Sequence, residues 1–152
     1  LEIVKSWGAD EIVNTLEDGK TSFREKVKEL TNGNGADVIY DPVGGDVFDE
    51  SIRCINWGGR LLVIGFAGGR ISNLPVNYPL IKGFSVIGVR AGEYGRKNPD
   101  LGKENIDIIN NLANEGKLKP HICKIFSFEH SLKALKYLKD RKLIGKVVIS
   151  IS

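Results

Sequence analysis

Two glycine-containing turns are the parts of this sequence whose residue types best suit contact with a ligand. The first turn, 41–45, has the sequence Asp-Pro-Val-Gly-Gly, and the second, 65–69, has the sequence Gly-Phe-Ala-Gly-Gly. Because glycine has no Cβ, a flat ligand ring can come close to the main chain there. Either turn alone is explained equally well by the ordinary role of glycine at the end of a strand or helix. Two such turns at one edge of a sheet favour the binding interpretation.

Side chains for nucleophilic or metal chemistry are not arranged in any recognisable way. The sequence has no G-x-S-x-G elbow, and Cys54 and Cys123 lie inside predicted elements without a C-x-x-C spacing. His121 is expected in a surface turn, and His130 in the first turn of a helix, where positive charge is disfavoured. The sequence therefore predicts no catalytic residue and no zinc site. Asp41 could act as a general base, but a carboxylate beside proline at a strand end more often accepts hydrogen bonds from local backbone amides.

The first turn is expected to join a strand to a helix. The apolar strand at 38–40 must end before Pro42, because proline lacks the N–H that a central ladder needs. Asp46 is the expected N-cap of the following helix, whose buried stripe begins at Phe48. The Trp-Gly-Gly sequence at 57–59 is expected to end this helix, since glycine accepts the left-handed conformation.

The second turn follows a strand of a different kind. Residues 61–64 (Leu-Leu-Val-Ile) are apolar without alternation, which is typical of a parallel strand covered on both faces. The two strands and the helix between them form a right-handed βαβ unit, so the turns at 41–45 and 65–69 should lie side by side. Ligands of open α/β sheets bind outside the carboxyl ends of the strands.

Strands and helices alternate through the rest of the chain, which is the α/β pattern. In chain order we expect the end of a helix at 1–8, a strand near 11–14, a helix opened by a capping box at Ser22 and Glu25, a strand at 84–90, a loop at 91–98, a helix at 99–115, a strand at 123–128, a helix at 129–141 and a strand at 145–151. Gly33 and Gly35 precede a strand instead of following one, so they do not form a dinucleotide phosphate loop.

Composition limits the classes of protein to consider. A chain of 152 residues with 41% hydrophobic and 27% charged residues is an ordinary single globular domain. The formal net charge of +3 supports no nucleic-acid or membrane partner. Unpaired thiols at Cys54 and Cys123, without a visible signal peptide, indicate a reducing and cytoplasmic location.

Several stretches together resemble the medium-chain dehydrogenase/reductase superfamily, and within it the zinc-free NADPH:quinone oxidoreductase branch. They are 8–14, 35–46, 57–69 and 145–149, and the resemblance runs in order through residues 1–152. It implies a partial Rossmann-type, doubly wound parallel sheet with three αβα layers. It also implies that residues 1–152 are the carboxyl-terminal part of a dinucleotide-binding domain, without the GroES-like catalytic domain and the first strands. Thr15 stands where some quinone reductases place a tyrosine against adenine, which leaves that contact in doubt.

The resemblance also implies which residues bind the cofactor. They are Asp41, Pro42, Val43 and Gly44 beside the adenosine half, Ile64, Gly65 and Phe66 beside the nicotinamide ribose, Ile87, Gly88 and Val89 at the carboxamide, and Arg141 with the weaker candidate Lys146 near the phosphates. The implied cofactor is NADP, with NAD possible, and no zinc. The implied reaction is hydride transfer to a quinone or enone, in a homodimer paired through strand 84–90.

Two alternatives remain beside this hypothesis. A truncated Rossmann half could serve as a dimerising, non-enzymatic interaction module. Another α/β class, such as a receiver or a methyltransferase domain, is disfavoured because no acidic cluster follows the first strand and no glycine-rich loop opens the chain. Without the implied missing parts, the 152-residue chain is expected to bind cofactor weakly and to be inactive. The sequence does not identify the substrate.

Overall fold

The computed structural model describes residues 2–17, 20–140 and 143–151. The chain divides into two compact units, Leu1–Ala91 and Gly92–Ser152. Each unit contains a parallel sheet with helices, so the predicted α/β class is confirmed. No helix in the described part of the chain is long and apolar enough to cross a membrane.

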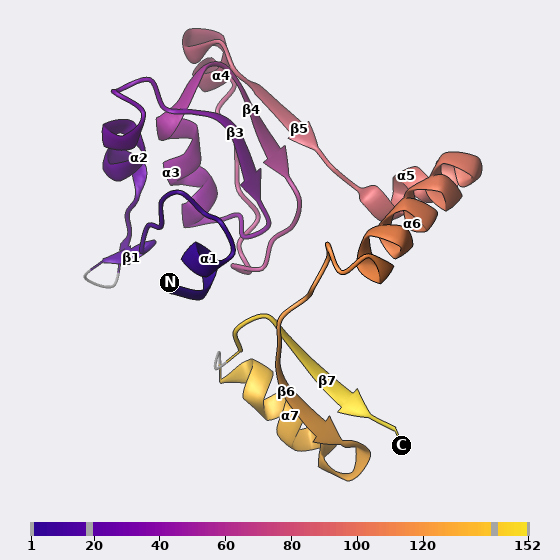
Figure 1. Cartoon of the computed structure of the whole chain (residues 1–152). Coiled ribbons are helices and arrows are strands. Elements are labelled where there is room, and N and C mark those ends of the chain that lie inside the picture. Colours follow the sequence, from indigo (N-terminus) through magenta and orange to yellow (C-terminus); the bar gives the residue numbers. More distant parts are fainter. Residues whose placement is uncertain (1, 18–19, 141–142, 152) are drawn as a thin grey trace. The chain divides into compact units, whose positions relative to one another are not determined.

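The first unit is built on a sheet of three parallel strands in the order β3-β4-β5 (Figure 1). These strands are β3 (Ala36–Asp41), β4 (Ile55–Val63) and β5 (Ser85–Gly88). In the register of the sheet, Asp41 pairs with Val63, and Val63 pairs with Gly88. All three strands therefore end at the same level, and the segments that follow them share one edge.

One face of this sheet carries the core of the unit. Helix α3 (Asp46–Cys54) lies against β3 and β4 and brings Phe48 and Ile52 onto Leu61, which is fully buried. The remaining members of the core are the buried Ile55 and Phe84 and the partly buried Ile39, Val63, Leu74, Tyr78 and Val86. Each fully buried side chain of this size stabilises the fold by roughly 1.5–3 kcal/mol.

The start of α3 and the course of β4 differ from the prediction. The N-cap is Gly45, at φ 58°, and no side chain caps the helix, so Asp46 is its first residue. The helix ends at Cys54, and the Trp-Gly-Gly sequence lies inside β4. The register shifts between Ala36 and Val38, because Ala36 faces Ile55 and Val38 faces Arg60. Gly59 thus lies at an irregularity of the strand, where a Cβ would come within 3.2 Å of the carbonyl oxygen of Ala36 in β3.

The first thirty residues also depart from the predicted elements. Helix α1 (Glu2–Ser6) is present, but residues 11–14 form no strand. The short antiparallel pair β1 (Leu16–Glu17) and β2 (Lys20–Thr21) follows them. Helix α2 (Arg24–Leu30) has Phe23 as its N-cap and no side-chain cap, so the predicted capping box at Ser22 is wrong.

The connection to β5 and the start of the second unit contain two further helices. They are α4 (Asn77–Lys82) and α5 (Ala91–Lys97), and the second replaces the loop predicted at 91–98. A Cβ added to Gly95 would lie 3.5 Å from the Cα of Gly102 in α6 (Pro99–Asn114). These glycines therefore allow two successive helices to touch. In the sequence, Gly95 instead indicates a loop.

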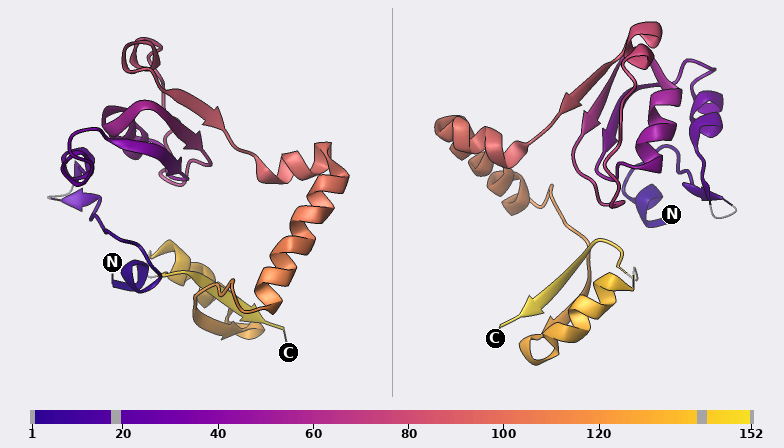
Figure 2. Two further views of the ribbon diagram at one scale, coloured as in Figure 1. Left: turned by 45° about the horizontal axis from the view of Figure 1, so that its top comes forward. Right: turned by 180° about the vertical axis from the view of Figure 1, so that it is seen from behind.

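The second unit ends in a small parallel α/β motif (Figure 2). Strands β6 (Ile122–Ser127) and β7 (Lys146–Ser150) pair with each other, and the short 3₁₀ helix η1 (Phe128–His130) and α7 (Ser131–Lys139) connect them. The predicted leucine stripe of α7 is not buried, since Leu132 and Leu135 are exposed. Ala134 is the buried residue of this helix.

Candidate functional site

The turn after β3 is held by the carboxylate of Asp41. Oδ1 of Asp41 accepts the amide N–H of Val43 at 2.8 Å and that of Gly44 at 2.9 Å, and the residue is 2% exposed. This confirms the interpretation that Asp41 accepts local backbone hydrogen bonds. The lone pairs of Oδ1 are committed to the turn, so the geometry gives Asp41 a structural role.

The turn after β4 is hydrogen-bonded directly to the turn after β3. The amide of Ala67 donates to the carbonyl of Pro42 at 3.1 Å, and the amide of Gly68 donates to the carbonyl of Val43 at 2.8 Å. On the other side, the amide of Val89 donates to the carbonyl of Val63 at 3.0 Å. The three strand ends therefore form one continuous rim, which we define as residues 41–45, 64–66 and 87–89.

The glycines of the rim do not all serve the same purpose. Gly44 has φ +68°, and a Cβ there would lie 3.0 Å from Cδ1 of Phe66. A Cβ on Gly65 would lie 3.3 Å from the carbonyl oxygen of Pro42. At these two positions glycine is explained by the close packing of the two turns, without a ligand. Gly88 is different, because a Cβ there would meet no atom within 4 Å, so its main chain is open to a ligand.

Two amides of the rim are also open. Among the hydrogen bonds of the described residues, none has the amide N–H of Gly65 or Phe66 as its donor. Both follow β4, between the other two strand ends. They are fixed donors of the kind that holds a carbonyl or amide group of a ligand.

A small cavity lies next to the rim. Its volume is about 160 Å³, and its lining is mostly apolar. The lining residues are Asp41, Gly44, Phe48, Val63, Phe66, Ile71, Ser72, Leu74 and Val86. An apolar cavity of about 150 Å³ is large enough for one benzene-sized ring.

The predicted cofactor residues fall into three groups. Ten of them lie at the rim or in the last residues of its strands: Asp41, Pro42, Val43, Gly44, Ile64, Gly65, Phe66, Ile87, Gly88 and Val89. Lys146 begins β7 in the second unit, where its amide donates to the carbonyl of His121 at 2.7 Å. Arg141 lies outside the described residues. The cofactor-binding role of all twelve stays a prediction.

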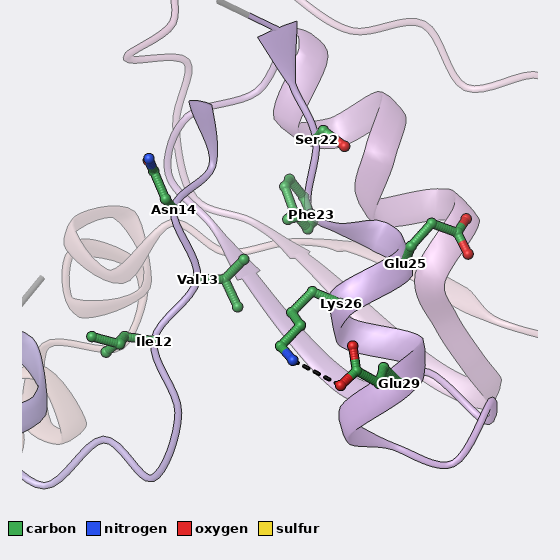
Figure 3. A pocket seen from close by; sticks show the side chains of 8 residues that line it. All are labelled: Ile12, Val13, Asn14, Ser22, Phe23, Glu25, Lys26 and Glu29. Atoms are coloured by element: carbon green, nitrogen blue, oxygen red, sulfur yellow. Dashed lines mark hydrogen bonds and ion pairs between the residues drawn. The ribbon is translucent and has the colours of Figure 1, made fainter. Parts of the chain in front are cut away.

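A larger cleft occurs at a different place in the first unit (Figure 3). It has a volume of about 320 Å³, and its lining residues are Ile12, Val13, Asn14, Ser22, Phe23, Glu25, Lys26 and Glu29. Nζ of Lys26 lies 2.8 Å from Oε1 of Glu29, and this partner raises the pKa of Lys26. The cleft contains none of the predicted cofactor-binding residues, and the positive charge of Lys26 is already paired with Glu29. Its larger volume alone therefore does not make it the better candidate for a cofactor site.

Three polar contacts near the rim were not predicted from the sequence. Oγ of Ser72 accepts the amide of Gly45 at 2.8 Å. Nη2 of Arg70 lies 2.8 Å from Oδ1 of Asp46 and 2.5 Å from Oδ2 of Asp49. The partners are 21 to 27 residues apart in the chain, so no short motif could have indicated them.

The described residues offer no metal site. They contain no group of three or more His, Cys, Asp or Glu side chains that could hold an ion. Cys54 and Cys123 are free thiols, and burial raises the pKa of the Cys54 thiol above its ordinary value. In the second unit, Oγ of Ser127 lies 3.1 Å from Nδ1 of His130 three residues away, on the exposed start of η1. This is a local contact between neighbouring residues of one turn.

A parallel α/β sheet with a ligand-accessible rim at its carboxyl edge is the general plan of dinucleotide-binding domains. Residues 1–109 match the family described as zinc-binding dehydrogenase. The chain therefore belongs to the zinc-binding dehydrogenase family, in the medium-chain dehydrogenase/reductase superfamily that its motifs resemble.

Individual relatives make the comparison more specific. The chain is 38% identical over 151 residues to the quinone oxidoreductase-like protein 2 homolog of Nematostella vectensis, covering 99% of this chain and 40% of that protein. It is 29% identical over 130 residues to the acryloyl-coenzyme A reductase of Sulfurisphaera tokodaii, covering 85% of this chain and 35% of that protein. Among solved structures, an NAD-dependent alcohol dehydrogenase matches with a TM-score of 0.80 at 28% identity, covering 100% of this chain and 41% of the other. The chain thus spans about two-fifths of the length of these relatives.

Proposed function

We propose that this chain is the nicotinamide-binding part of an NAD(P)H-dependent reductase of quinones or enones, acting without zinc. The rim supports this proposal, since three strand ends meet there and leave the amides of Gly65 and Phe66 open. Family membership and the names of the relatives support the class of substrate. Both a quinone and an acryloyl thioester contain a double bond conjugated to a carbonyl group, so one hydride-transfer chemistry serves both.

The rim suits the uncharged nicotinamide end of the cofactor better than its phosphates. The amides of Val43 and Gly44 are already bonded to Asp41, and that of Gly45 is bonded to Ser72. The carboxylates of Asp46 and Asp49 lie in the first turn of α3 and share one cation, Arg70, so this turn keeps a net negative charge that repels phosphate. We therefore propose that Gly65, Phe66, Gly88 and Val89 hold the carboxamide and ribose, and that Arg141 and Lys146 are candidates for the phosphates.

The protein groups at the rim would bind and orient the ring. When bound, the dihydronicotinamide supplies the hydride. Fixed backbone donors keep the ring in place. The side chain of Phe66, which lines the cavity and is 46% exposed, offers an apolar surface beside it. The carboxylate of Asp41 takes no part in proton transfer in this proposal, since it is bonded within the turn.

Pairing of two copies through β5 is the second element of the proposal. In the described sheets β5 pairs with β4 on one side only, and its residue Ile87 is 40% exposed. An apolar edge strand favours association with another strand. Light scattering on the purified chain should give a dimer, and Ile87→Lys should give a monomer. A monomeric unsubstituted chain would contradict the pairing.

The enzymatic proposal is tested on the full-length protein that carries this chain. Oxidation of NADPH and of NADH should be followed with benzoquinone and with an enone as acceptors, with and without a zinc chelator. We expect acceptor-dependent oxidation that the chelator does not change. Loss of activity with chelator would contradict zinc independence, and no oxidation with either acceptor would contradict the proposed reaction.

The exposed edge of β5 equally suits a dimerising module without enzymatic activity, which we keep as the second candidate. Calorimetric titrations of the full-length protein with both nucleotides distinguish the two. A dimer that binds neither nucleotide would support the module. The free thiols of Cys54 and Cys123 accord with the proposed reducing, cytoplasmic location of either candidate.

A further inference from the structure

The segment after β4 crosses the turn after β3 and is fastened to it at several points. We call residues 66–72 the strap. Its amides at Ala67 and Gly68 donate to the carbonyls of the first turn. At its far end, Oγ of Ser72 accepts the amide of Gly45 at 2.8 Å. Between these two attachments, Arg70 reaches the first turn of α3.

One nitrogen of Arg70 makes both ion pairs with this helix. Nη2 lies 2.8 Å from Asp46 and 2.5 Å from Asp49, which are neighbours on one face because they are three residues apart. The carbonyl oxygen of Arg70 would lie 3.4 Å from a Cβ on Gly44, so the backbone of the strap is close to the turn there. The guanidinium thus fixes the middle of the strap against α3.

These ion pairs are too exposed to contribute much to the stability of the fold. The side chains of Arg70, Asp46 and Asp49 are 47%, 74% and 43% exposed. Exposed pairs of this kind contribute from about zero to about 1 kcal/mol. The ion pairs instead restrain the position of the strap. This segment contains the sequence Ala-Gly-Gly at 67–69, so it has few side chains of its own that could hold it in place.

The restrained segment includes groups proposed to contact the cofactor. Phe66, the first residue of the strap, and Ile71, near its end, both line the cavity beside the rim. The open amides of Gly65 and Phe66 immediately precede the bonded part of the strap. A strap that moved away from α3 would therefore widen the cavity and displace both donors.

We propose that Arg70 is a positioning residue, which holds the strap on Asp46 and Asp49 so that the amides of Gly65 and Phe66 keep the geometry needed for the nicotinamide ring. This inference rests on the proposed function, because it takes the rim as the cofactor site. It adds a role for three charged side chains that do not themselves contact the ring.

The first test concerns the strap without cofactor. Hydrogen exchange of the Gly68 amide should be up to about fivefold faster in Arg70→Gln than in the unsubstituted chain, which is the factor that corresponds to about 1 kcal/mol, the upper end for exposed ion pairs. The double variant Asp46→Asn with Asp49→Asn should show the same acceleration. Arg53→Gln, in the last turn of the same helix, serves as the matched control and should change nothing. Unchanged exchange in Arg70→Gln would overturn the inference.

The second test concerns the cofactor and uses the full-length protein. Arg70→Gln should raise the KM for the nicotinamide nucleotide about tenfold while kcat at saturating nucleotide changes little. The urea midpoint should change little, and Arg70→Lys should recover part of the affinity because it keeps the charge. Faster exchange with an unchanged KM would overturn the positioning role. Failure of the unsubstituted protein to bind nucleotide would instead reject the proposed function, whatever the exchange data show for the strap.

Discussion

The amide nitrogen of Gly68 lies 2.8 Å from the carbonyl oxygen of Val43, so the turn after β4 is hydrogen-bonded to the turn after β3. This bond joins two segments that lie far apart in the sequence and next to each other in the sheet. It makes the strand ends one rim instead of separate loops. The stability of the turns and the proposed binding of the cofactor therefore depend on the same contacts.

Gly44 should be sensitive to substitution for two separable reasons. Gly44→Ala places a side chain at φ +68° and also brings Cβ to 3.0 Å from the ring of Phe66. We expect it to lower the free energy of unfolding by about 2–3 kcal/mol, of which about 1–2 kcal/mol is the cost of the left-handed backbone. The matched control is Gly58→Ala, with φ +71° and open space around its Cβ, which carries only the backbone cost. Equal losses in the two variants would show that the contact with Phe66 is unimportant.

Urea unfolding of the first unit can be followed selectively. Both tryptophans of the chain, Trp7 and Trp57, lie in that unit, so their fluorescence reports on it. The same measurement serves the next two predictions.

Asp41 should matter as a hydrogen-bond acceptor and not as a base. Asp41→Ala leaves the amides of Val43 and Gly44 without their acceptor and should cost about 2–4 kcal/mol, since a bond to a charged group contributes about 1.5–3 kcal/mol and the two bonds share one oxygen. Asp41→Asn keeps an oxygen acceptor and should cost about 1 kcal/mol. In the full-length protein, Asp41→Asn should retain most of its hydride-transfer rate. A rate reduced by a thousandfold with normal stability would instead identify Asp41 as a general base.

Leu61 should be the most sensitive aliphatic position of the first unit. It is fully buried in β4, the central strand of the sheet, and Leu→Ala changes in such sites cost about 2–5 kcal/mol. Leu80→Ala in α4 is the control, because Leu80 is 81% exposed and its loss should cost less than about 0.5 kcal/mol. Similar midpoints for the two variants would contradict the assignment of the core.

The thiol of Cys54 should be protected at neutral and mildly alkaline pH. Burial raises its pKa above the ordinary value of 9.0, so the folded state disfavours the thiolate. Because the folded pKa is the higher one, the contribution of this thiol to stability is complete below pH 9.0 and is lost as the pH rises further. A disulfide reagent should therefore modify the half-buried Cys123 first, and Cys54 only on unfolding. Comparison of Cys54→Ser with Cys123→Ser assigns each reaction, and rapid native modification of Cys54 would refute the prediction.

The strands of the rim could be predicted because their signals are local. Residues 61–64 are apolar without alternation, and Pro42 ends the preceding strand, so both strands and their shared edge followed from the sequence. The role of Asp41 also followed, because its partners are only two and three residues away.

Two of the errors arose where glycine has more than one use. The Trp-Gly-Gly sequence at 57–59 fits both a helix end and an irregular strand, and only the pairing with β3 decides between them. Gly95 fits both a loop and a contact between helices, which depends on Gly102 in another helix. The partners of Arg70 are 21 and 24 residues away, so no short sequence spacing indicates these ion pairs.

The most direct test of the account is an amide NMR titration of the isotope-labelled chain with NADPH. The dissociation constant of the chain alone is expected to be weak, roughly 1 mM, which corresponds to about −4 kcal/mol. We predict that the largest shift changes occur at Gly65, Phe66, Gly88 and Val89, with small changes at Ile12 and Lys26 in the larger cleft. Changes centred on that cleft, or a rim that does not respond at saturating nucleotide, would contradict it.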